Sequence, residues 1–120
     1  MSKIFFQDNM MIQRDSFGEH IRMLREQNRL PLRKVAAALD IDPSTLSKIE
    51  RGERSANKEM LSPLSELFNE SVEELGVILL SDKVAYDLMK ESNPKEILKV
   101  AEQKIEYLKN KNTQQGSLDF

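Results

Sequence analysis

The sequence predicts an all-α fold, and three observations lead to that prediction. Apolar residues recur three and four positions apart along most of the chain, which is helical spacing. Residue pairs typical of helix starts precede several of these stretches, as Ser16 and Glu19 do. The 120 residues are 39% hydrophobic and 32% charged, which suits a modest core under a charged surface. We therefore expect one helical domain with an appended segment.

Residues 1–15 are predicted to form an N-terminal arm. The arm is apolar and rich in methionine but has no clear period. Three interpretations stay open: disorder, packing on the domain or a partner, and translation that starts at Met10 or Met11.

The first helix is predicted to begin after Ser16. Ser16 and Glu19 match a capping box, in which each side chain binds the other residue's backbone amide. The core-facing residues are expected to be Phe17, Ile21 and Leu24. His20 is expected at the surface, because a lone histidine without partners at metal spacing makes no metal site.

Leu30 to Gly52 predicts two short helices joined by a tight turn. Asp42 is a favourable N-cap, and Pro43 then takes the first helical position, where its missing N–H costs nothing. The residues expected to bury the two inner faces together are Val35, Ala36, Leu39, Leu46 and Ile49.

Three further helices are predicted. Asn57 is expected to cap a fourth, whose apolar face is Met60, Leu61, Leu64, Leu67 and Phe68. Ser71 and Glu74 match a second capping box, which opens a helix that runs from Val72 to about Lys90. A last helix is expected from Pro94 to about Lys109, with an apolar stripe of Ile97, Leu98, Ala101, Ile105 and Leu108.

The stretch from Val35 to Gly52, with Phe17 to Glu26 upstream, resembles the helix-turn-helix domain of Cro/C1-type repressors, also called the xenobiotic-response-element type. The resemblance covers about Ser16 to Leu75. It implies a five-helix, lambda-repressor-like domain that usually binds palindromic operators as a dimer. It also implies that Arg25 and Glu50 form a structural ion pair between the first and third helices.

Three positions depart from the family pattern. Leu32 stands where the family usually has a polar residue that contacts phosphate. Asp40 stands where the family usually has glycine in the turn, and aspartate tolerates the left-handed conformation better than most residues. Pro63 falls inside the expected fourth helix, which it should bend.

The resemblance places the DNA-reading residues on the second helix of the motif. The residues expected to face the major groove and contact bases are Pro43, Ser44, Thr45, Ser47 and Lys48. Arg33, Arg51 and Arg54 are expected to contact phosphates instead. The alternative for the serines and Thr45 is an ordinary solvated helix face.

Charge is unevenly distributed, although the net charge is only −2. Residues 14–58 hold ten Lys and Arg against seven Asp and Glu, whereas residues 59–120 hold seven against twelve. All seven arginines lie between Arg14 and Arg54, and arginine is the better phosphate and base-edge donor. This distribution favours double-stranded DNA as a partner of the first half.

Composition also excludes several classes. The chain has no cysteine, one histidine and no glycine-rich phosphate loop, so we expect no enzyme, no cofactor, no catalytic residue and no metal site. No apolar run has the length of a membrane span, and the N-terminus lacks a signal-peptide pattern, so we expect a cytoplasmic protein.

The expected organisation is an arm (1–15), a helix-turn-helix domain (16–75), a helical extension (76–109) and a disordered tail (110–120). The extension is expected to form or extend a homodimer interface, and the alternative is that its helices fold back on the same subunit. The sequence therefore predicts a homodimeric regulator of a palindromic operator, such as a restriction–modification controller or a phage or mobile-element repressor, with RNA polymerase as a possible partner. The alternative is an antitoxin that binds a toxin through its C-terminal helices and autoregulates through the DNA-binding domain.

Overall fold

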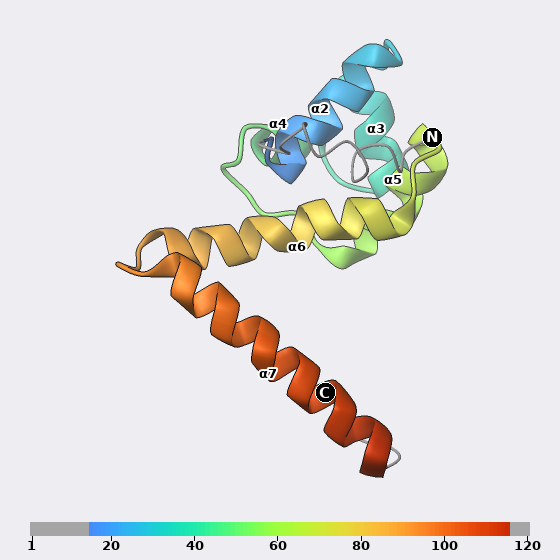
Figure 1. The fold of residues 1–120 in the computed structure, drawn as a ribbon. Coiled ribbons are helices and arrows are strands. Elements are labelled where there is room, and N and C mark those ends of the chain that lie inside the picture. The colour runs from blue at the N-terminus through green and yellow to red at the C-terminus, as the bar shows by residue number, and fades with distance from the viewer. Residues whose placement is uncertain (1–14, 116–120) are drawn as a thin grey trace. The chain divides into compact units, whose positions relative to one another are not determined.

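The fold is all-α, as the sequence predicts (Figure 1). The computed structural model describes residues 15–115, which contain six α-helices and one short 3₁₀-helix, η1. Residues up to Lys83 form one compact unit, and those from Val84 form a second. The helix bounds are α2 Phe17–Gln27, α3 Leu32–Leu39, α4 Pro43–Glu50, η1 Lys58–Met60, α5 Leu61–Phe68, α6 Val72–Met89 and α7 Pro94–Gln115.

The core of the first unit is a single apolar cluster, to which all five of its α-helices contribute. Burying such side chains stabilises the fold by about 1.5–3 kcal/mol each. Leu32, at a position where the family usually has a polar residue, packs against this cluster, so here it serves the core. The buried members are Phe17, Ile21, Leu24, Val35, Ala36, Leu46, Leu61, Leu64, Phe68, Leu75 and Ile78.

Three hydrogen bonds hold the start of α2. The predicted capping box is present: the Ser16 hydroxyl accepts from the Glu19 amide at 3.1 Å, and the Glu19 carboxylate accepts from the Ser16 amide at 3.0 Å. In addition, the Phe17 amide donates to Asp82 Oδ2 at 2.9 Å. Asp82 lies on α6, seven residues beyond the expected domain end at Leu75. Since Ile78 is also buried, α6 remains part of the domain structure up to Lys83.

Gly18 lies where α2 crosses the end of α4. A Cβ atom at this position would stand 2.0 Å from the backbone oxygen of Ile49 and 3.1 Å from the Cα atom of Glu50. Only a residue without a side chain allows the two backbones to approach this closely. Gly18 therefore sets the distance between the first helix and the helix that the sequence assigns to DNA reading.

The turn between α3 and α4 follows the prediction in its backbone. Asp40 ends α3 in the left-handed conformation, with φ of 58°, so aspartate does take the backbone shape that the family usually gives to glycine. Asp42 occupies the N-cap of α4 and Pro43 its first position. The Asp42 side chain makes no capping bond, contrary to expectation, and only its carbonyl oxygen accepts, from the Leu46 amide at 3.1 Å.

The predicted fourth helix is divided in two. Asn57 precedes η1 but makes no side-chain capping bond, and the α-helix begins only at Leu61. Pro63 thus falls in the first turn of α5, where an amide has no helical partner to lose, and the expected bend becomes a change from 3₁₀- to α-helix. Leu67, which was predicted to face the core, is 36% exposed.

Helix α6 runs through the predicted range and is apolar on two sides. Its start is bound by Ser71, whose hydroxyl accepts from the Glu74 amide at 3.2 Å. Leu75 and Ile78 are buried in the core. On the opposite side of the helix, Val77, Leu80 and Val84 each keep nearly half of their surface exposed.

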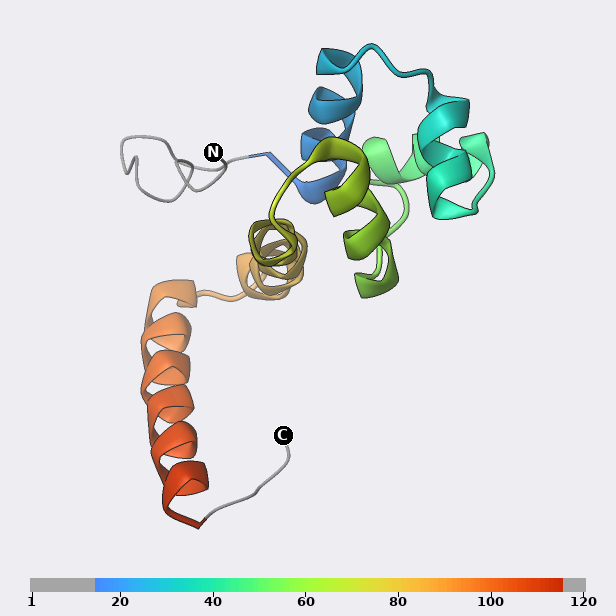
Figure 2. The same ribbon diagram turned by 90° about the vertical axis from the view of Figure 1, so that its right-hand side faces the viewer.

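Helix α7 is longer than predicted (Figure 2). It was expected to end near Lys109, with a disordered tail from 110, but it continues to Gln115 because no glycine or proline interrupts it before Gly116. None of its described side chains is buried. The predictions for residues 1–14 and 116–120 fall outside the described residues.

Among the helices of residues 15–115, none is long and apolar enough to cross a membrane.

Candidate nucleic-acid interface

Helix α4 has an inner and an outer face with different chemistry. Leu46, Ile49 and Glu50 are buried, with 1–6% of their surface exposed. Pro43, Ser44 and Lys48 are exposed, and Thr45 and Ser47 are half-buried. The inner face therefore fixes the helix to the domain, while the small polar and basic side chains remain available to a ligand.

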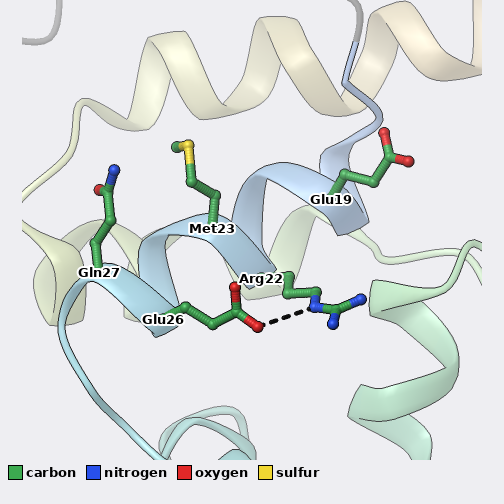
Figure 3. Close-up of a pocket in the computed structure, with 5 residues that line it drawn as sticks. All are labelled: Glu19, Arg22, Met23, Glu26 and Gln27. Atoms are coloured by element: carbon green, nitrogen blue, oxygen red, sulfur yellow. Dashed lines mark hydrogen bonds and ion pairs between the residues drawn. The ribbon is translucent and has the colours of Figure 1, made fainter.

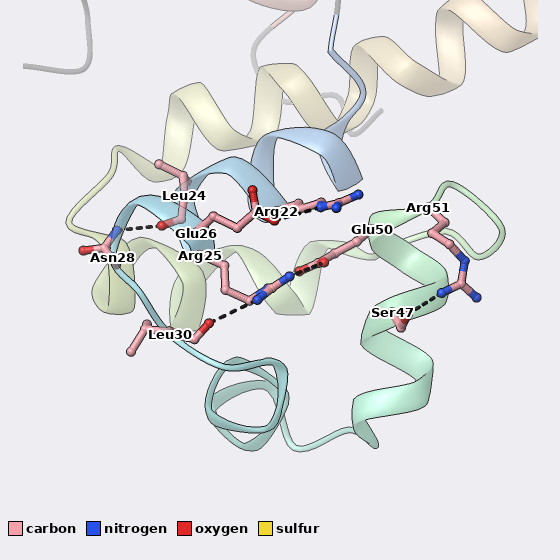
Figure 4. A network of polar contacts seen from close by, with 9 residues as sticks. All are labelled: Arg22, Leu24, Arg25, Glu26, Asn28, Leu30, Ser47, Glu50 and Arg51. Atoms are coloured by element: carbon pink, nitrogen blue, oxygen red, sulfur yellow. Dashed lines mark hydrogen bonds and ion pairs between the residues drawn. The ribbon is translucent and has the colours of Figure 1, made fainter.

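An ion pair fixes α4 to α2 from within (Figure 4). Arg25 Nε donates to Glu50 Oε2 at 2.7 Å, and Arg25 Nη2 donates to Glu50 Oε1 at 3.0 Å. The side chains are 14% and 5% exposed, respectively. The hydrogen bonds to Glu50 raise the pKa of Arg25 above its ordinary value. A bidentate geometry of this kind defines the relative orientation of the two helices as well as their distance.

Arg25 also orders the chain that leads to α3. Its Nη1 donates to the carbonyl oxygen of Leu30 at 3.1 Å. One guanidinium thus holds both α4 and the loop that follows α2, which makes Arg25 the central polar residue behind the outer face of α4.

A second polar cluster lies on the other side of α4. Arg51 Nε donates to Glu53 Oε2 at 2.9 Å, and Arg51 Nη2 donates to Glu53 Oε1 at 3.1 Å. Arg51 Nη1 also donates to Ser47 Oγ, one helical turn earlier (Figure 4). Hydrogen bonding to the opposite charge raises the pKa of Arg51 and lowers that of Glu53. These three residues form a connected group on the outer side of α4.

The remaining predicted phosphate contacts lie on the flanks of α4. Arg33 is exposed on α3, and Arg54 is exposed in the loop that follows α4. The structure thus brings the predicted base contacts together on one short helix and places arginines on the elements before and after it.

Sequence reasoning missed two residues of this region. Gly18 was passed over, although a glycine inside a helical pattern is a signal of close packing. Glu53 gives no signal in the sequence, because residues two apart do not face each other on a helix. It reaches Arg51 only because the chain leaves the helix there and Gly52 takes a φ of 78°.

A shallow hollow on the outer face of α2 is a weaker candidate for a binding site (Figure 3). All of its lining side chains come from one helix: Glu19, Arg22, Met23, Glu26 and Gln27. Glu19 is used in the capping box, and Arg22 Nε binds Glu26 Oε2 at 3.1 Å. Its main charged groups therefore already have partners, and we assign no ligand to it.

Comparison with known families agrees with this geometry. Residues 21–75 match the family model described as "Helix-turn-helix", a range that contains α3, α4 and the arginine–glutamate pair behind them. Residues 21–75 form a Cro/C1-type helix-turn-helix domain. No curated protein and no solved structure matches the chain.

The helix-turn-helix match indicates the kind of partner that this domain binds. The match supports a DNA-binding transcriptional regulator, and α4 is the second helix of the matched motif. Among the residues that the structure describes, no group of three His, Cys, Asp or Glu side chains is placed to hold a metal ion.

Proposed function

We propose that this helix-turn-helix protein binds a palindromic operator sequence-specifically as a homodimer. The observation that carries the proposal is the construction of α4. Its inner face is anchored by Leu46, Ile49 and the Arg25–Glu50 pair, so its outer face is rigidly presented. A rigid helix with short polar side chains fits the major groove, where each base pair shows a distinct pattern of donors and acceptors.

Each outer residue has a role in this proposal. The base contacts are Pro43, Ser44, Thr45, Ser47 and Lys48, and Lys48 is the donor suited to guanine O6 or N7. Arg33 and Arg54 bind phosphates. Arg51, the third predicted phosphate contact, already holds Glu53 and Ser47.

The first experiment is selection of binding sites from random duplex DNA with the purified protein. The expected result is a two-fold symmetric motif whose half-sites lie about one DNA turn, ~34 Å, apart. Protein that is folded by circular dichroism but enriches no sequence would overturn sequence-specific binding. Ser44→Ala and Lys48→Ala should then each remove a preference at one base pair, by about 1–3 kcal/mol.

The homodimer is proposed to form through the C-terminal helices. Leu98, Ile105 and Leu108 lie along one side of α7 and are 40–53% exposed. Apolar stripes of this kind are characteristic of helices that pack on a partner. A second copy is the partner that a two-fold symmetric operator requires.

A matched pair of variants tests this interface. Ile105→Lys places a charge in the apolar stripe, whereas Gln103→Lys adds the same charge on the opposite side of α7. Sedimentation should show the first variant as a monomer and the second as a dimer. If both variants remain dimeric, the interface is elsewhere.

The same exposed stripe also fits the antitoxin alternative, in which a toxin covers α7. That alternative predicts C-terminal helices that are protease-sensitive in the chain alone and protected by the toxin. A restriction–modification controller or a phage or mobile-element repressor predicts a stable dimer without any further protein. Limited proteolysis of the wild-type chain alone therefore separates the two classes, because a dimer interface protects the C-terminal helices and an uncovered stripe does not.

A further inference from the structure

The outer side of α4 carries an arginine that is already bound. Arg51 places Nε and Nη2 on the two oxygens of Glu53 and Nη1 on Ser47 Oγ. A guanidinium has five N–H donors. Arg51 uses three of them for hydrogen bonds within the protein. The bidentate arrangement with Glu53 is the geometry in which arginine and a carboxylate recognise each other most specifically.

This arrangement changes what Arg51 offers to DNA. A phosphate attracts a basic side chain because binding releases counterions in proportion to the charge that is neutralised. The carboxylate of Glu53 lies directly on the guanidinium and offsets its charge. Arg51 is thus poorly suited to act as an additional phosphate contact, in contrast to Arg54, the other exposed arginine of this loop.

The arrangement also determines the state of Ser47. Its oxygen accepts a hydrogen bond from a cationic donor, so its own hydrogen points away from Arg51. The hydroxyl of Ser47 can then donate to a group on the outer side of α4, such as a base edge in the groove. The acceptors that a donor can meet there are purine N7, guanine O6 and thymine O4, whereas the amino group of cytosine offers no acceptor.

We propose that Arg51 and Glu53 are a positioning pair that holds Ser47 as a hydrogen-bond donor toward an acceptor on a base edge. The inference rests on the proposed function, since it assigns a chemical partner to one residue of the same interface. It departs from the sequence-based prediction that Arg51 binds phosphate.

The test combines binding-site selection with a salt titration of DNA affinity for the wild type and five variants. Ser47→Ala and Arg51→Ala should lose the preference at the same base pair. Arg51→Ala should leave the dependence of log affinity on log salt nearly unchanged. Arg54→Ala, the matched control, should keep every base preference and reduce that slope by about one. Glu53→Gln should release Arg51 to bind a phosphate, so the slope of log affinity against log salt should steepen by about one. The same variant should weaken the preference at the base pair that Ser47 contacts.

Arg51→Lys separates positioning from charge. Lysine retains the charge but cannot hold a carboxylate with two parallel bonds, so the preference at the Ser47 base pair should stay lost. All substituted side chains are exposed or at the surface of α4, so melting temperatures should remain at the wild-type value, which thermal denaturation checks.

Three results would overturn the inference. If Arg51→Ala lowered the affinity for all DNA sequences alike and reduced the slope of log affinity against log salt by about one, Arg51 would be a phosphate contact. A preference that survives in Arg51→Ala but not in Ser47→Ala would show that Ser47 needs no positioning. Folded wild-type protein that selects no sequence would overturn the proposed function, and this inference with it.

Discussion

Helices α2 and α7 have similar sequence patterns and opposite surroundings. Helix α2 begins after the Ser16–Glu19 capping box, α7 begins with a proline, and both carry an apolar stripe at helical spacing. In α2, four of eleven residues are buried: Phe17, Gly18, Ile21 and Leu24. Helix α7 has 22 residues, and none of its side chains that the structure describes, up to Asn112, is buried.

The comparison separates what makes a helix from what gives it a position. Periodicity and caps act locally and indicate a helix in both cases. Tertiary packing supplies most helical stability in proteins, and α2 obtains it from α4, α6 and the core. No described residue buries the apolar stripe of α7. The stability of this helix therefore depends on what binds the stripe.

The largest effect should come from equal truncations in the two stripes. Leu24 is 5% exposed on α2, and Leu24→Ala should lower the free energy of unfolding by about 2–5 kcal/mol through lost burial and a cavity. Leu98 is 46% exposed on α7, and Leu98→Ala should change the free energy of unfolding by less than about 0.5 kcal/mol in the monomer.

Urea unfolding at two protein concentrations measures both variants. A cost for Leu98→Ala that grows with protein concentration would show that a second copy covers the stripe. Equal large costs for both substitutions at the lowest concentration would contradict the contrast between the helices.

The next effect concerns the ion pairs of α2. Glu50→Ala leaves Arg25 without its buried partner and should cost about 3 kcal/mol, the lower end for buried pairs because Arg25 is still 14% exposed. It should also weaken DNA binding, because α4 loses its anchor. Glu26→Ala is the control: its pair with Arg22 is 57% exposed on both sides, so solvent screening keeps the cost below about 0.5 kcal/mol. An unchanged melting temperature in Glu50→Ala would refute the structural role of the pair.

Two glycine-to-alanine substitutions should have opposite signs. Gly18→Ala drives a methyl group into the backbone of α4 and should destabilise the domain by about 1–3 kcal/mol. Gly76→Ala on α6 meets Leu61 Cδ1 at an ordinary 3.6 Å and should stabilise by up to about 1 kcal/mol through helix propensity. Thermal denaturation measures both shifts, and a neutral Gly18→Ala would mean that the helices can separate without cost.

The sequence predicted the helices well because caps and periodicity are local. Ser16, Asp40 and Pro43 each take their expected place, and the helix from Val72 reaches the expected end near Lys90. Distant contacts were beyond that reasoning. Asp82 binds the amide of Phe17, 65 residues earlier, and no local pattern indicates such a bond.

The site was predictable where it follows from helix geometry. The split of α4 into an apolar inner face and a polar outer face can be read from residue spacing. The Arg25–Glu50 ion pair was predicted from the family resemblance alone. The two residues are 25 positions apart, so no local spacing rule indicates that they meet. Glu53 depends on the backbone of Gly52 after the helix ends, which spacing rules do not describe.

The smallest effect is a pH dependence that should belong to α2 and not to α7. Burial lowers the pKa of His20 below its ordinary value of 6.5, with partial opposition from the charges of Glu70 and Asp15. The unfolded chain therefore binds this proton at a higher pH than the folded chain does. Stability should then fall as the pH drops from about 7 through 6.5 toward the lowered pKa.

His20 is the chain's single histidine, so moving it tests the assignment directly. The double variant His20→Gln with Gln103→His transfers the imidazole to an exposed position on α7, where burial no longer shifts its pKa. Urea unfolding at pH 7.5 and 5.5 should show a loss of stability at the lower pH that is smaller in the double variant. An equal loss of stability in the wild type and the double variant would assign the pH dependence to other groups. The position of the imidazole, half-buried on α2 or exposed on α7, would then have no effect on stability.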